Sequence, residues 1–171
     1  MSWVFYNTNV YGDCNEEYDI SGEEYEKLLE VCFKYCDTLM LKVVRNDLKN
    51  VNRFDTYRTA KPAGVDEKCL QSITTCGDRY LKDQFRFYKL CPGLFELMKE
   101  TSNSIFGWAE CWNNTPEDPV FIRADGSIFF DSTIHEGELV LFPRDEEKVT
   151  EIISNKLWLP DDMRLKFDFK F

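Results

Sequence analysis

The chain has 171 residues but only one histidine, His135. This scarcity excludes the common metalloprotease pattern, which needs two histidines one helical turn apart. None of the seven cysteines stands in a CxxC pair, so the usual zinc and redox spacings are missing. No glycine-rich phosphate loop is present either, which removes the common sequence signature of nucleotide-binding enzymes. We therefore expect neither a metal nor another cofactor.

Long apolar runs are also missing, since no segment approaches the roughly 20 residues that a helix needs to span a bilayer. The opening stretch "MSWVFYNTNVYGDCNEEYD" has no basic region ahead of an apolar one, unlike a signal peptide. An odd number of cysteines without such a signal indicates reduced thiols that pack as small apolar side chains. We expect a cytoplasmic protein that does not insert into membranes.

Basic residues are outnumbered, with 21 lysines and arginines against 31 acids and a net charge of −10. The acids concentrate in residues 13–30 and 110–151, whereas residues 34–61 are mainly basic. Such a surface repels phosphates, so nucleic acid and anionic lipid are disfavoured as partners. The same charge would attract a cationic partner, and it would equally keep the protein in solution.

The composition is that of a folded domain. Hydrophobic residues make up 43% of the chain and aromatic residues 15%, which argues against disorder. The length suits one globular domain, residues 1–171, with a sizeable core.

Three segments have helical periodicity. In residues 21–36 the apolar side chains recur at helical spacing, and Ser21 and Glu24 have the spacing of a capping box. A shorter helix is predicted for residues 91–103, with Pro92 in its first turn, and a third for residues 144–158.

Strands are predicted wherever polar and apolar residues alternate. Residues 120–142 hold three short runs separated by "ADG" and "HEG", whose glycines can take the positive φ that hairpin turns require. Residues 47–77 have only a weak pattern and are interpreted as a long loop, as is "NNTPEDP". Further strands are predicted at residues 2–7, 37–46, 83–90, 104–112 and 163–171. The order of elements indicates an α+β fold with a mainly antiparallel sheet and about three helices on one face.

His135 and Glu136 are the first candidates for chemistry. A general base needs a second group that orients it, but residues adjacent on a strand point to opposite faces. Cys32 and Cys36 share a helix face, where packing in the core is the commoner role. We therefore assign no catalytic residue, and we interpret the His-Glu-Gly segment as the tip of a hairpin.

Two sets of residues remain as candidate binding sites. Trp108 and Trp112 share one face of their predicted strand, where they would either pack in the core or line a pocket with His135. Acids near the first helix and the HEG turn would attract a basic partner if they lie on one side of the fold. The candidate contacts are Glu16, Glu17, Asp19, Glu23, Glu24 and Glu136.

The chain resembles a group of small acidic bacterial proteins in the order of three segments. These are "LLEVCFKYCDTLML", then "FIRADGSIFFDSTIHEGELVLFP", then a helix ending near "LW". Some of these proteins resemble the immunity partners of polymorphic toxins. The resemblance implies a cytoplasmic protein without catalysis, which blocks a toxin through an acidic surface. It carries over no residue-level motif, so it implies a class and no site.

The leading hypothesis is therefore an acidic, immunity-type binding protein whose partner is a basic protein toxin. The first alternative is a small enzyme or ligand-binding domain with a pocket near His135, Trp108 and Trp112. The second is a structural module that oligomerises through its alternating tail, residues 164–171.

Overall fold

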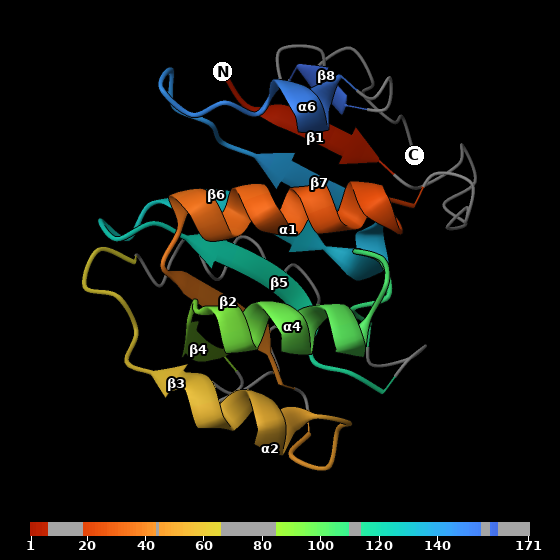
Figure 1. The fold of residues 1–171 in the computed structure, drawn as a ribbon, viewed down its shortest axis with the longest axis vertical. Coiled ribbons are helices and arrows are strands. Elements are labelled where there is room, and N and C mark those ends of the chain that lie inside the picture. The colour runs from red at the N-terminus through yellow and green to blue at the C-terminus, as the bar shows by residue number, and fades with distance from the viewer. Residues whose placement is uncertain (7–18, 44, 66–84, 110–113, 155–157, 161–171) are drawn as a thin grey trace, which may run out of the picture.

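The computed structural model describes residues 1–6, 19–43, 45–65, 85–109, 114–154 and 158–160. These residues contain eight strands in one sheet, ordered β3-β4-β2-β5-β6-β7-β1-β8, and every pairing is antiparallel (Figure 1). The strands are β1 (Trp3–Tyr6), β2 (Thr38–Lys42), β3 (Arg58–Thr59), β4 (Phe85–Lys89), β5 (Glu117–Ile122), β6 (Ile128–Thr133), β7 (Glu138–Leu141) and β8 (Trp158–Pro160).

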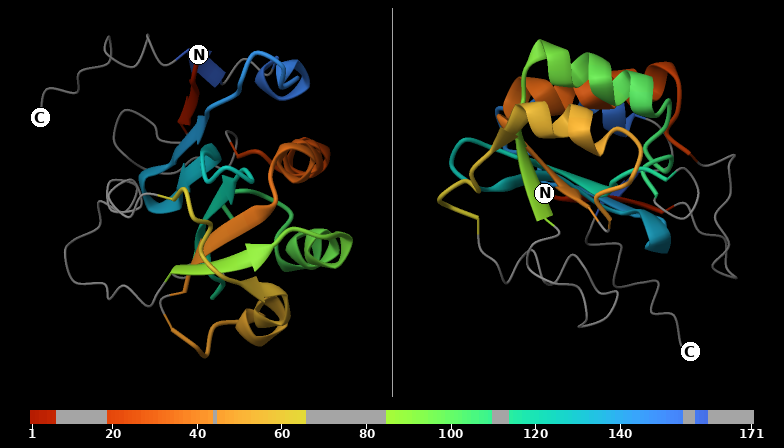
Figure 2. Two further views of the ribbon diagram at one scale, coloured as in Figure 1. Left: turned by 90° about the vertical axis from the view of Figure 1, so that its left-hand side faces the viewer. Right: turned by 90° about the horizontal axis from the view of Figure 1, so that it is seen from below.

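The described helices all lie on one face of this sheet, as the side view in Figure 2 shows. They are α1 (Glu23–Tyr35), α2 (Val51–Phe54), α4 (Pro92–Thr101) and α6 (Thr150–Ile153), with 3-10 turns η2 (Asp55–Tyr57) and η4 (Ile134–Glu136). The predicted α+β class, with a mainly antiparallel sheet and helices on one face, is confirmed.

Side-chain alternation along β2 divides the core between the two faces of the sheet. Leu39 and Leu41 point toward the helices and join the main core cluster, which also holds the apolar stripe of α1. Met40 points to the opposite face and packs with Val120 and Ile122 of β5. Because all five residues of β2 are buried, this strand lies at the centre of the fold.

The stripe predicted for α1 is buried at four positions, Tyr25, Leu28, Leu29 and Cys32. Burial raises the pKa of the Cys32 thiol, as expected for a cysteine that packs in the core. The predicted capping box is wrong. Gly22, not Ser21, occupies the N-cap with a φ of 58° and has no side chain that could accept a capping hydrogen bond, whereas Ser21 forms a β-bridge with Ser104.

The strand predicted for residues 104–112 is wrong over residues 104–109, where the chain turns after the bridge at Ser104. The hydroxyl of Ser102 donates to the carbonyl of Ser104 (2.7 Å), and the backbone N–H of Gly107 donates to the hydroxyl of Ser104 (3.1 Å). These local hydrogen bonds replace the ladder that a strand would need. Residues 110–113 lie outside the described part.

The long helix predicted for residues 144–158 is also wrong, since only Thr150–Ile153 is helical in the described part. The side chain of Glu147 and the backbone N–H of Lys148 are held by tertiary hydrogen bonds, and Trp158 belongs to β8. The predicted loop is wrong over residues 51–59, which form α2, η2 and β3, with Val51 and Phe54 buried. Residues 47–50 and 60–65 have no helix or strand, as predicted. Residues 66–77 and the predicted tail strand lie outside the described residues.

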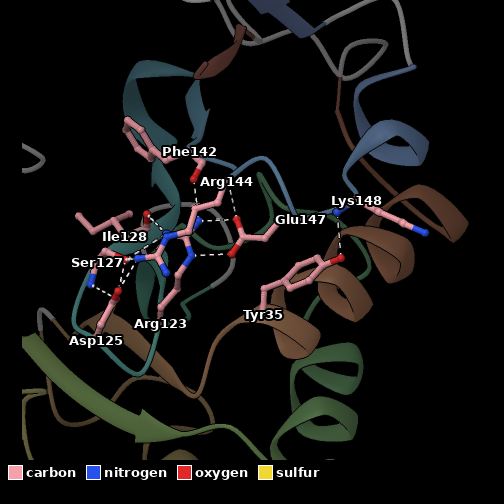
Figure 3. A network of polar contacts seen from close by, with 9 residues as sticks. All are labelled: Tyr35, Arg123, Asp125, Ser127, Ile128, Phe142, Arg144, Glu147 and Lys148. Carbon is pink, nitrogen blue, oxygen red and sulfur yellow. Dashed lines mark hydrogen bonds and ion pairs between the residues drawn. The ribbon is translucent and has the colours of Figure 1, made fainter.

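A buried arginine joins the β5–β6 hairpin to the segment that follows β7 (Figure 3). Arg123 binds both carboxylate oxygens of Glu147, with Nε to Oε1 at 2.7 Å and Nη2 to Oε2 at 2.6 Å. The remaining guanidinium N–H groups donate to the carbonyls of Ile128 and Phe142, each at 2.7 Å, and to the hydroxyl of Ser127 at 3.2 Å. The Arg123–Glu147 pair therefore ties three successive segments of chain together.

The Arg123–Glu147 pair connects to α1 through its aromatic neighbours. The guanidinium carbon of Arg123 lies 5.1 Å from the centre of the Phe129 ring, which packs on Tyr35 at the end of α1. The hydroxyl of Tyr35 accepts the backbone N–H of Lys148 at 2.9 Å, next to Glu147 (Figure 3). The position of α1 on the sheet thus depends on the same network.

We predict that Glu147→Gln lowers the free energy of unfolding by about 3 kcal/mol or more, because it leaves a buried guanidinium without a counter-charge. Urea denaturation at pH 7 measures the change. Arg144→Gln is the matched control, since its ion pair with Asp125 is about half exposed and should contribute less than about 1 kcal/mol. Equal losses in both variants would contradict the assignment.

Candidate functional site

Five charged or titratable side chains form a cluster at one end of the sheet, which we call the charged cluster. β2, β5 and β6 meet there, at the end that leads into η4. Strand alternation places Lys42 and Asp131 on the face away from the helices, because Leu41 and Phe130 beside them belong to the helix-side core. The members are Lys42, Glu117, Asp118, Asp131 and His135.

A bulge in β5 creates the cluster. Between the pairs Met40–Val120 and Lys42–Glu117, β5 has one residue more than β2. Asp118 takes up this extra length with a φ of 50°, a conformation that aspartate tolerates better than most residues. The bulge also explains how Pro119 can lie in a central strand, so the loop predicted for "NNTPEDP" is wrong from Glu117 onward.

Glu117 is the centre of the charged cluster. Its Oε1 accepts a hydrogen bond from Nε2 of His135 at 2.8 Å, and its Oε2 accepts one from Nζ of Lys42 at 3.1 Å. The Lys42 ammonium also lies 3.7 Å from Oδ2 of Asp118, whose Oδ1 accepts the backbone N–H of Ile134. Lys42 and His135 therefore both bind Glu117, and Lys42 also lies beside Asp118, the residue that forms the bulge.

Burial and charge act in opposite directions on the two acids of the bulge. Burial opposes ionisation of Glu117, but the hydrogen bond from His135 and the charge of Lys42 outweigh it and lower the pKa. For Asp118 burial prevails over the backbone hydrogen bond and raises the pKa. Glu117 is thus the stable anion of the pair, and its partners compensate its charge.

Burial and the nearby charge of Asp118 also raise the pKa of Asp131, to about 7. Its Oδ1 is buried and has no hydrogen-bond partner among the described residues. A protonated carboxyl tolerates this position far better than a carboxylate does. The native state therefore favours neutral Asp131 at mildly acidic pH.

The cluster can hold and orient the His135 ring, but its geometry does not build a metal centre. No group of three or more metal-ligating side chains within the described ranges has a suitable arrangement. The carboxylate that orients His135 is Glu117, not the neighbouring Glu136. Such a carboxylate fixes the ring tautomer in many sites, and here the same carboxylate also neutralises a buried lysine.

The proposed pocket residues lie in different surroundings. Trp108 is fully buried, and its indole N–H donates to the hydroxyl of Tyr25 at 2.9 Å. Its ring packs on Phe54, on the helix side of the core. His135 is exposed at the end of β6, and Trp112 is outside the described residues. Trp108 therefore presents no surface to a ligand.

The candidate contact residues are spread over two places. Glu23 and Glu24 are exposed on the first turn of α1, whereas Glu136 is exposed on η4. Asp19 is partly buried, and its Oδ1 accepts the backbone N–H of Phe106 at 3.3 Å, so it has a structural role. Glu16 and Glu17 are outside the described residues.

A surface hollow of about 430 Å³ lies where α1, α6 and β8 meet, and we call it the acidic hollow. The exposed carboxylates of Glu24 and Glu151 stand at its edge together with Lys27, and Trp158 forms part of its wall. Ile20, Ile152 and Ser154 complete the lining. Of the candidate contact residues that the structure describes, Glu24 borders this hollow.

Sequence reasoning missed Lys42, Glu117, Asp118 and Asp131. Lys42 interrupts a run of apolar strand residues, and Asp131 directly follows the apolar run "IFF". A charged residue within an apolar strand is the sequence signal that could have indicated these buried charges. Their partners come from strands up to 75 residues apart, and the bulge that aligns Glu117 with Lys42 has no local sequence signature.

Comparison of the chain with protein-family models, curated proteins and solved structures finds no match. Across the described segments, no helix has both the length and the apolar character required to cross a membrane.

We predict that Asp131→Asn stabilises the protein at pH 8 and loses this advantage as the pH falls. The native pKa of about 7 lies above the unfolded value of 3.8, so wild-type stability decreases as the pH rises between these values. The full shift corresponds to at most about 4 kcal/mol. Urea titrations at pH 4, 6 and 8 measure it, and a difference that does not depend on pH would rule out the raised pKa.

Proposed function

We propose that this chain is an acidic, cytoplasmic binding protein that engages a basic protein partner, as an immunity-type antagonist engages its toxin. The observation that carries this proposal is the acidic hollow, where the exposed carboxylates of Glu24 and Glu151 and the ammonium of Lys27 border a cavity with an apolar lining. A lysine or arginine side chain fits such a place, since the carboxylates pair with its charge and its aliphatic stem can lie on the apolar lining.

The surface of α1 supports the proposal. Glu23, Glu24, Glu26 and Glu30 are all exposed on this helix, against Lys27 and Lys34. Their negative charge is part of the net charge of −10 of the whole chain and would speed the approach of a basic protein. The first turn of α1 therefore extends the negative surface of the acidic hollow.

The charged cluster favours binding over catalysis. Lys42 and His135 both bind the carboxylate of Glu117, and this central residue is buried. The arrangement stabilises the end of the sheet and carries Glu136 on η4 at the surface. The His135–Glu117 contact is nonetheless the one observation that favours the alternative of a small enzyme, since a histidine oriented by a carboxylate is a common general base.

The test is binding to the product of the adjacent gene, produced separately and titrated by calorimetry at low and high salt. We expect Glu23→Lys/Glu24→Lys to weaken the affinity about tenfold or more at low salt, because two attractive charges become repulsive. The difference should shrink at high salt. Retention of normal affinity would remove the first turn of α1 from the interface.

The matched control is Asp47→Lys/Glu100→Lys, which changes the net charge equally on the α2 and α4 side of the molecule. Both control residues are exposed, and the ion pairs that they lose each contribute less than about 1 kcal/mol. A comparable loss of affinity in the control would mean that overall charge, not the α1 surface, controls binding.

A further inference from the structure

A second surface hollow, of about 560 Å³, opens between the C-terminal end of α1 and the N-terminal end of α4. We call it the α1–α4 groove. It lies on the helix-covered face of the sheet, where Figure 1 shows the two helices side by side. It shares no lining residue with the acidic hollow or the charged cluster.

The antiparallel packing of the two helices holds the groove open. At one end, Lys99 of α4 bridges to Glu26 of α1 at 3.0 Å and draws the helices together. At the other end, the backbone N–H of Leu90 donates to the carbonyl of Asp37 at 2.8 Å. Leu90 and Asp37 both line the groove, so the hydrogen bond between their backbones helps to set its width.

The floor of the groove is apolar and aromatic. The rings of Phe33 and Phe95 meet edge to face, with centroids 5.1 Å apart, and Phe33 packs beneath on Phe121 of the core. Leu90, Cys36 and Cys91 contribute further apolar surface, and all of these lining side chains are only partly buried. A large apolar side chain can therefore enter and cover surface that now faces water.

The rim of the groove is negative. The exposed carboxylates of Glu30, Asp37 and Glu96 surround it, against the ammonium of Lys34. The ammonium of Lys99, which pairs with Glu26, also lies 5.5 Å from the centre of the Phe95 ring. The C-terminal end of α1 and the N-terminal end of α4 meet here, and their opposite dipole charges largely cancel. The carboxylates therefore decide the sign of the local potential.

We propose that the α1–α4 groove binds an amphipathic segment of the partner, whose apolar anchor enters the groove while flanking lysines or arginines face the rim. This inference rests on the proposed function, because it assigns a second contact to the same basic partner. The apolar floor supplies affinity, and the three carboxylates select cationic flanks over anionic ones.

The test uses a blocked synthetic peptide of about 14 residues, in which leucines repeat at helical spacing between lysines. Two matched peptides replace the leucines with serines or the lysines with glutamates. Nuclear magnetic resonance titration should show that the leucine–lysine peptide shifts the backbone amides of Phe33, Leu90 and Phe95. The two matched peptides should bind at least tenfold more weakly.

Charge reversal at the rim, Glu30→Lys/Glu96→Lys, should weaken binding of the leucine–lysine peptide about tenfold at low salt. The control Asp47→Lys/Glu100→Lys should leave the affinity within about twofold. A second readout is alkylation of Cys91 by iodoacetamide, which the bound peptide should slow, as measured by mass spectrometry of the Cys91 fragment. Shifts that map elsewhere, or equal binding of the serine peptide, would overturn the proposal.

The same variants separate this inference from the proposed function. If Glu23→Lys/Glu24→Lys abolishes binding of the adjacent gene product while Glu30→Lys/Glu96→Lys does not, the groove proposal fails and the proposed function stands. If rim reversal weakens that complex as well, both stand. If the peptide binds in the groove but the adjacent gene product does not bind at all, the proposed partner is wrong.

Discussion

The rest of the structure depends on the neutralisation of one buried cation, the guanidinium of Arg123. A charge removed from water costs several kcal/mol unless a counter-charge and hydrogen bonds replace the solvent. Glu147 supplies the charge and the carbonyls of Ile128 and Phe142 accept the remaining N–H groups, so three segments must come together. This requirement sets the course of the chain after β7 and brings Lys148 to Tyr35 at the end of α1.

The position of α1 then determines both hollows of the helix-covered face. Its N-terminal half borders the acidic hollow, and its C-terminal half forms one wall of the α1–α4 groove. The opposite face of the sheet has a different role, because there the bulge at Asp118 aligns Glu117 with Lys42 and His135. The helix-covered face thus exposes carboxylates to solvent at the two hollows. On the opposite face, the carboxylate of Glu117 is paired with Lys42 and His135.

Regular periodicity made much of the fold predictable from the sequence. The stripe of α1, the position of Pro92 in α4 and the glycine turns between β5, β6 and β7 are local features, and all were predicted correctly. The errors arose where a distant partner overrides local preference. Ser21 was predicted to cap α1 but instead pairs with Ser104. Glu147 was predicted to lie in a helix but instead binds Arg123.

The candidate sites were less predictable than the fold for the same reason. His135 stood out as the only histidine, but its partner Glu117 lies 18 residues earlier and is aligned by a bulge. The residues around Trp108 alternate as in a strand, yet Trp108 lies in the core, where its indole N–H donates to the hydroxyl of Tyr25. Among the predicted contact acids within the described residues, Glu24 is the one found at a hollow.

The central claim is that the chain binds a basic partner through the helix-covered face. Hydrogen–deuterium exchange of the protein, alone and with the adjacent gene product, tests it most directly. We expect slower exchange in the complex over residues 23–35 and 90–96, with little change at residues 117–118 and 131–136. Protection confined to residues 117–118 and 131–136, with none on α1 or α4, would contradict it.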